Sequence, residues 1–187
     1  MLKAILNKAL DRFESRYYYD VSYSRYILSH SLLAFRKLAR LTSFSQHHEG
    51  LPTEVLYAAK ITSAMQADCG PCTQLMVTWA EEARVCATVI HAVLTRDHEF
   101  MSDDVRLAVK FVEASLARDL EADALRERIR AKWGDNAVIT MAFAITAGQI
   151  FPTLKYALGF GHACTLVKVA GKSVQVSRDV PKILQEI

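Results

Sequence analysis

Cys69 and Cys72 are separated by only two residues, in the string "CGPC". Pro71 suits the first turn of a helix, where its missing N–H would have no partner. Asp68, directly before the pair, is a good N-cap residue. We therefore predict that both cysteines lie in the opening turn of a helix that runs to about Glu82. A first turn can adjust from the usual Cβ separation of about 5–6 Å to the roughly 3.8 Å of a disulfide.

This predicted position favours thiol chemistry. Unpaired N–H groups and the positive dipole at a helix N-terminus stabilise a thiolate, and a second cysteine can close an intramolecular disulfide. Two other interpretations are a zinc site and a pair of inert buried thiols. A structural zinc site needs four ligands, and no second CxxC exists, so His162 with Cys164, or His47 with His48, would have to complete it. The spacing favours a redox-active dithiol.

The surrounding segments place apolar residues at the helical period. The pattern predicts about eight helices, over residues 2–13, 22–41, 53–67, 70–82, 86–95, 103–119, 121–133 and 136–158. Ser102 is expected to cap the sixth of these and Gly134 to end the seventh, while Pro152 should kink the last. Only "CTLVKVAGKSVQVS" alternates, which predicts a small hairpin around Ala170 and Gly171. The fold class expected is one all-α domain spanning residues 1–187.

Composition excludes several classes of protein. The net charge is +3, with 23 basic and 20 acidic side chains interspersed, which disfavours nucleic-acid binding. Four cysteines are too few for a secreted disulfide scaffold, and the N-terminal segment does not resemble a signal peptide. The longest apolar run, residues 137–151, is too short to span a bilayer. We therefore expect a cytoplasmic protein without a membrane partner. No phosphate-binding or dinucleotide motif is present, so neither a cofactor nor a metal is expected.

A helix, a small polar turn, a CxxC and a second helix follow one another in "EVLYAAKITSAMQADCGPCTQL". This arrangement resembles the alkylhydroperoxidase D / carboxymuconolactone decarboxylase family. The resemblance is clearest over about residues 50–100 and extends to residues 132–159. It implies an all-α fold, a homo-oligomer built as a trimer or a multiple of trimers, a peroxidatic role for Cys72 and a resolving role for Cys69.

The peroxidase branch of that family has a Glu twelve residues before the first cysteine and a His four residues after the second. Here these positions hold Tyr57 and Met76, and neither side chain is a base near neutral pH. The candidate substitutes are Tyr57 as a hydrogen-bond donor, Asp68 beside the pair and His91 on the following helix. Gln66, His30 and His162 have less in their favour, and Cys86 and Cys164 are interpreted as small core residues.

The function expected is a thiol-dependent oxidoreductase, either a peroxidase or a disulfide reductase. It would use a peroxide or disulfide substrate and an external thiol reductant. One alternative is the decarboxylase branch, which an intact CGPC and the lack of convergent cationic groups near the motif disfavour. The other is a non-catalytic redox sensor or a small-molecule binding module, which would account for the loss of both relay residues.

Overall fold

A computed structural model describes residues 2–161 and 166–177, and that part of the chain contains nine helices and one two-stranded sheet. The elements are α1 Leu2–Tyr17, α2 Ser22–His30, α3 Leu32–Ser45, α4 Thr53–Gln66, α5 Gly70–Glu82, α6 Ala87–Thr95, α7 Asp103–Ala117, α8 Glu121–Trp133, α9 Asp135–Ala157, β1 Leu166–Val169 and β2 Lys172–Gln175. The all-α prediction is confirmed.

The predicted helix over residues 22–41 is wrong in one respect, because it is two helices that meet at Ser31. The backbone of Ser31 is extended, with φ −147°, and its hydroxyl accepts a hydrogen bond from the Ala34 N–H. A serine in this position caps a new helix rather than continuing the old one. This break lets α2 and α3 pack on each other as a hairpin.

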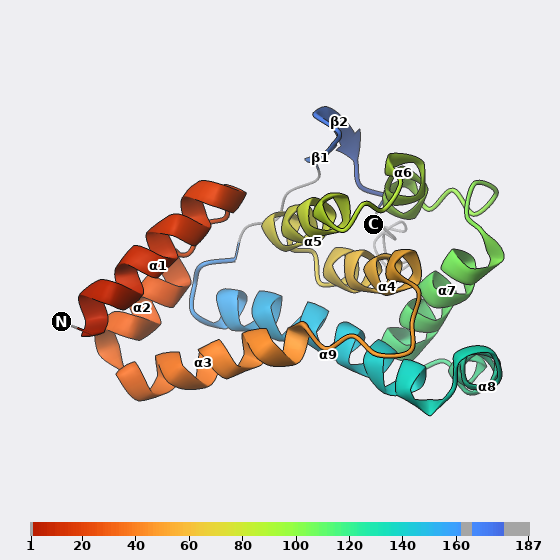
Figure 1. Cartoon of the computed structure of the whole chain (residues 1–187), viewed down its shortest axis with the longest axis horizontal. Coiled ribbons are helices and arrows are strands. Elements are labelled where there is room, and N and C mark those ends of the chain that lie inside the picture. The colour runs from red at the N-terminus through yellow and green to blue at the C-terminus, as the bar shows by residue number, and fades with distance from the viewer. Residues whose placement is uncertain (1, 162–165, 178–187) are drawn as a thin grey trace, which may run out of the picture.

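Helix α4 lies at the centre of the fold and packs against α5, α6, α7 and α9 (Figure 1). Its closest neighbour is α9, and the two backbones approach at Ser63 and Gly148. A Cβ built on Gly148 would lie 2.3 Å from the Ser63 Oγ. The Ser63 hydroxyl donates to the Ile145 carbonyl at 2.8 Å, and the Gln149 amide donates to the Ser63 carbonyl at 2.8 Å. These contacts fix α4 against the middle of α9.

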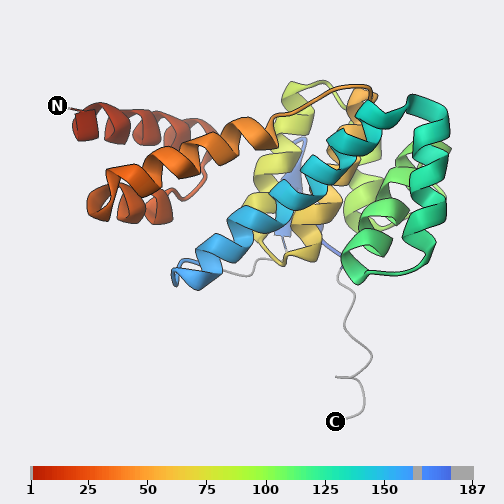
Figure 2. The same ribbon diagram turned by 90° about the horizontal axis from the view of Figure 1, so that it is seen from below.

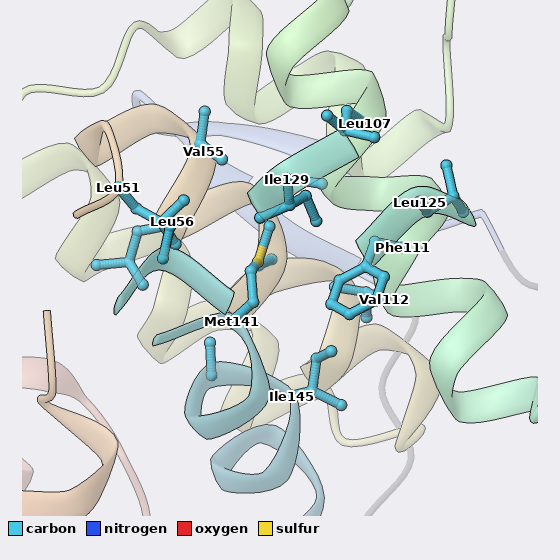
Figure 3. Packing of buried hydrophobic residues seen from close by; sticks show 14 of the residues in the cluster. Leu51, Val55, Leu56, Leu107, Phe111, Val112, Leu125, Ile129, Met141 and Ile145 are labelled. Atoms are coloured by element: carbon cyan, nitrogen blue, oxygen red, sulfur yellow. The ribbon is translucent and has the colours of Figure 1, made fainter. Parts of the chain in front are cut away.

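One hydrophobic cluster lies between α4, α7, α8 and α9. Figure 3 shows Leu56, Phe111, Ile129 and Met141 converging from these elements on one interior. A second cluster joins α4 to α5, α6, α7 and the hairpin, which contributes Val167, Val169, Val174 and Val176. The apolar residues that are spaced at the helical and strand periods therefore pack into the core, as the sequence predicted.

The C-terminal hairpin is confirmed as well. β1 and β2 pair antiparallel, with Val169 opposite Lys172 and a turn at Ala170 and Gly171. Both turn residues have positive φ, 47° and 77°, which is the backbone geometry of a tight hairpin turn. The hairpin is attached to α5, since the Gln74 side chain bonds both the carbonyl and the N–H of Lys168.

Helices α1, α2 and α3 lie together at one end of the molecule, beside α5 and α9 (Figures 1 and 2). α1 is connected to α5 by an ion pair between Arg16 and Glu82, at 2.9 Å, and by an edge contact of the Tyr17 and Trp79 rings. The N-terminal helices therefore cover one face of α5. That is the face on which the second cysteine lies.

Within the described residues, α9 is the one helix long and apolar enough to cross a membrane by length and composition. The apolar run at 137–151 was predicted to be too short, but the helix that contains it has 23 residues. A core helix of a soluble protein meets the same criterion, and α9 packs along α3, α4 and α8. The cytoplasmic location stays a prediction.

Candidate active site

Cys69 and Cys72 form a disulfide at the start of α5, with their Cα atoms 5.2 Å apart. Cys69 is the N-cap residue, with an extended backbone, and Pro71 lies in the first turn, as the sequence predicted. The Cys69 carbonyl accepts hydrogen bonds from the Thr73 N–H and hydroxyl. Cys72 therefore belongs to the first turn, where backbone N–H groups have no intrahelical partner.

The prediction that Asp68 caps α5 is wrong, because the cap position belongs to Cys69 and no side chain caps the helix. Asp68 has a positive φ of 50°, a conformation that Asp tolerates better than most residues. It ends the turn that leaves α4, and its carbonyl accepts a hydrogen bond from the Tyr156 hydroxyl at 3.2 Å. The residue shapes the chain between the two helices.

A cavity of about 290 Å³ lies between the N-terminal helices and the bundle formed by α4, α5 and α9. Cys72 lines this cavity, whereas Cys69 does not. The apolar lining residues are Leu6, Ala9, Leu10, Phe13, Val21, Phe35, Ala64, Leu75, Met76, Trp79, Ala144, Ala147, Phe151 and Pro152. Both cysteines are buried, with residue exposures of 4% for Cys69 and 7% for Cys72, and of the two only Cys72 faces the cavity.

Tyr19, in the loop between α1 and α2, contacts the disulfide directly. Its hydroxyl lies 3.8 Å from the Cys72 Sγ, and both residues are buried. A disulfide sulfur has no hydrogen to donate, so the hydroxyl is the donor in this contact. Burial raises the pKa of Tyr19 well above its ordinary value, which keeps the hydroxyl protonated at neutral pH.

Two buried lysines lie near the site, one lining the cavity and one packed on Tyr19, although no convergent cationic residues were expected near the motif. Lys60, on α4, lines the cavity, and its Nζ lies 5.4 Å from the centre of the Tyr57 ring. Lys155, on α9, has its Nζ 4.5 Å from the centre of the Tyr19 ring and 5.4 Å from that of Tyr23. Burial lowers the pKa of both lysines.

Tyr57 and Met76, at the Glu and His positions of the resembled peroxidases, lie in different surroundings. Met76 lines the cavity with Cys72. Tyr57 is half-buried against the second hydrophobic cluster, and burial raises its pKa. Tyr57 reaches the cavity only through its contact with Lys60, which lies three residues further along the same helix face. Tyr57 is thus placed to hold Lys60 rather than to touch sulfur.

His91 is exposed on α6 and does not line the cavity, so the structure does not bring it together with the cysteines. Gln66 and His30 are also exposed. The interpretation of Cys86 as a core residue is wrong. Cys86 is an exposed free thiol at the N-cap of α6, and its hydrogen bond with Thr88, at 3.1 Å, lowers its pKa.

The zinc interpretation depends on histidines that lie elsewhere. The His48 ring bonds the Leu51 carbonyl, and the His47 ring packs on Phe143. His162 and Cys164 lie outside the described residues. In the described ranges, no three potential ligand side chains gather into a metal site.

No family model, curated protein or solved structure matches this chain. The functional argument therefore depends on the geometry of the cysteine pair, the cavity and the groups that line them.

Sequence reasoning missed Tyr19, Tyr23, Lys60 and Lys155. The two lysines carried a signal, because each is a lone cation on an otherwise apolar or small-residue helix face, in "AAKITSA" and "FPTLKYA". Burial of a lysine among apolar residues costs free energy and is uncommon without a role. Tyr19 carried no such signal, since its approach to Cys72 spans 53 positions of the chain.

Proposed function

We propose that this protein is a thiol-dependent oxidoreductase in which Cys69 and Cys72 alternate between a dithiol and a disulfide. The observation that carries the proposal is the disulfide at the first turn of α5, with Cys72 opening on a cavity. A helix N-terminus favours the thiolate that such chemistry needs.

Cys72 is the sulfur proposed to meet the substrate. It lines the cavity and receives the Tyr19 hydrogen bond, whereas Cys69 does not line the cavity and is the N-cap residue. This division of roles agrees with the one implied by the resemblance to the alkylhydroperoxidase D family. We retain that family, and the homo-oligomer it implies, as part of the proposal.

With an organic hydroperoxide as oxidant, the Cys72 thiolate attacks the terminal peroxide oxygen, which carries the proton, and forms a sulfenic acid. The O–O bond breaks, and the alkoxide leaves as an alcohol after protonation. The Cys69 thiol then attacks the sulfenic acid, forming the S–S bond and releasing water. An external dithiol reduces the disulfide by two exchange steps, which restore both thiols. The Tyr19 hydroxyl is positioned to stabilise the Cys72 thiolate before it attacks and when reduction releases it.

The test counts thiols in a Cys86→Ser/Cys164→Ser background, which removes the two cysteines outside the pair. The reduced protein is mixed with cumene hydroperoxide, and free thiols are measured over time. Loss of two thiols, with continuous consumption of peroxide when dithiothreitol is present, supports the proposal. Matched Cys72→Ser and Cys69→Ser variants should abolish turnover, and only Cys69→Ser should retain a peroxide-sensitive thiol. Two thiols that do not react with peroxide or with a disulfide would contradict the proposal.

A redox sensor is the second candidate, and burial of both sulfurs favours it. Residue exposures of 4% and 7% restrict access by large reductants such as a protein dithiol. In the same assay, a sensor oxidises once and is reduced too slowly to sustain turnover.

A further inference from the structure

The cavity beside Cys72 combines an apolar wall with one cation. Apolar side chains from α1, α3, α5 and α9 form most of its surface, and Lys60 is the charged residue that lines it. Among the described residues that line the cavity, none is an aspartate or a glutamate. The other polar groups are hydroxyls, from Tyr19, Tyr23, Ser24, Thr42 and Ser45.

The Lys60 ammonium is buried without an anionic partner in the part of the chain that the structure describes. Its Nζ lies 5.4 Å from the centre of the Tyr57 ring, and burial lowers its pKa. Lys155 differs, because the charge of Asp20 opposes the lowering of its pKa and two tyrosine rings face its Nζ. A buried charge is costly unless it is paired. Lys60 therefore needs an anion more than Lys155 does.

We propose that this cavity binds an apolar organic anion, with its carboxylate against the Lys60 ammonium and its hydrocarbon part against the wall formed by α1, α5 and α9. The volume of about 290 Å³ is at the lower end of the range for small-molecule sites, which favours a single medium-length chain or a compact ring system over a bulky lipid. The ligand would lie beside the Cys72 sulfur. Binding of this anion does not involve sulfur chemistry and is independent of the proposed oxidoreductase function. Only its role as the substrate of Cys72 rests on that proposed function.

The test compares three probes that share a ten-carbon tail: decanoate, decan-1-ol and decyltrimethylammonium. Each is titrated calorimetrically into the full chain below its micelle concentration. Decanoate should bind most tightly, the alcohol more weakly, and the cation least. Equal affinity for all three probes, or no binding of decanoate, would overturn the proposal.

The Lys60→Met variant keeps the length and burial of the side chain and removes its charge. It should weaken decanoate binding by about ten- to a hundredfold, the range expected for a charge-assisted hydrogen bond, and leave decan-1-ol binding unchanged. Lys37→Met, an exposed position on α3, makes the same change in net charge and should not alter either affinity. An equal loss in both variants would assign the effect to general electrostatics and reject the site.

Trp79 provides a second readout, because it lines the cavity. In a Trp133→Phe background its emission should change on addition of decanoate and remain constant in Lys60→Met at the same concentration. Titration of a Cys69→Ser/Cys72→Ser variant separates the two proposals. Binding that persists without the thiols, alongside a failed peroxide assay, would reject the oxidoreductase and keep the anion site. The reverse outcome would reject the anion site alone.

Discussion

The Tyr19 hydroxyl lies 3.8 Å from the Cys72 sulfur, inside a cluster that also contains Tyr23, Leu38 and Leu75. The loop between α1 and α2 thus supplies a hydrogen-bond donor to a sulfur on α5. The Lys155 Nζ lies 4.5 Å from the centre of the Tyr19 ring. Tyr19 therefore contacts a sulfur through its hydroxyl and a lysine through its ring.

Replacing Tyr19 with Phe should slow the reaction of Cys72 without unfolding the protein. The ring and its packing on Phe13 and Lys155 remain, and one hydrogen bond to the sulfur is lost. A bond to charged sulfur of about 1.5–3 kcal/mol predicts a rate at least tenfold lower. Stopped-flow measurement of hydroperoxide-driven thiol loss checks this. Tyr18→Phe, which removes an exposed hydroxyl from the neighbouring position, is the matched control, and an equal reduction in both variants would argue against a direct role for Tyr19.

Reducing the disulfide should leave the protein folded. The bond joins residues three apart, and a loop this short restricts the unfolded chain little. The chain-entropy relation gives a stabilisation of about 2 kcal/mol. Urea unfolding should therefore show a single cooperative transition both with and without a phosphine reductant, and the two transitions should be similarly steep. Loss of cooperative unfolding after reduction would instead identify the disulfide as a structural requirement.

Changing Gly148 to Ala should destabilise the protein, although alanine is the better helix former. The new Cβ would lie 2.3 Å from the Ser63 Oγ and 3.2 Å from the Ser63 carbonyl carbon, so α4 and α9 must move apart. We expect a loss of about 1–3 kcal/mol in the free energy of unfolding.

Thermal and urea unfolding measure this loss. Thr146→Ala, at an exposed position of the same helix, is the control and should change stability by less than about 0.5 kcal/mol. Equal stability of Gly148→Ala and the wild type would show that the contact between α4 and α9 relaxes freely.

Replacing Lys60 with Met should raise the free energy of unfolding at neutral pH. It should also make this free energy depend less on pH in the alkaline range. In the folded protein burial lowers the pKa of Lys60 from the ordinary 10.5, so the unfolded chain binds the proton more tightly. The free energy of unfolding of the wild type then increases as pH rises from the lowered pKa towards 10.5.

The measurement is the difference in urea unfolding free energy between the wild type and the variant at intervals above pH 7. Subtraction removes the contribution of tyrosines and exposed lysines that titrate in both proteins. The free energy of unfolding of the variant should exceed that of the wild type by less as the pH increases. A constant difference would mean that Lys60 keeps an ordinary pKa in the folded state.

The order of the helices, the position of the cysteines and the hairpin could be predicted from sequence because each depends on local chemistry. Each signal depends only on residues close by in the chain: the apolar spacing, the Ser102 cap, the helix end at Gly134 and the turn at Ala170 and Gly171. Two local expectations were wrong for local reasons. Ser31 begins a new helix, and Asp68 ends a turn instead of capping α5.

The environment of Cys72 was decided only by tertiary structure. Tyr19, Lys60 and Lys155 come from three separate segments. Nothing in their sequence spacing specifies that Tyr19 contacts the Cys72 sulfur, that Lys60 lines the same cavity, or that Lys155 packs on the Tyr19 ring. Burial makes the difference, since a lysine that would be solvated on a surface has no anionic partner among the described residues once it is buried beside the apolar wall of the cavity. The sequence by itself determined where two thiols sit on a helix. The packing of α1, α2 and α9 around them decided which thiol faces a cavity and which groups surround it.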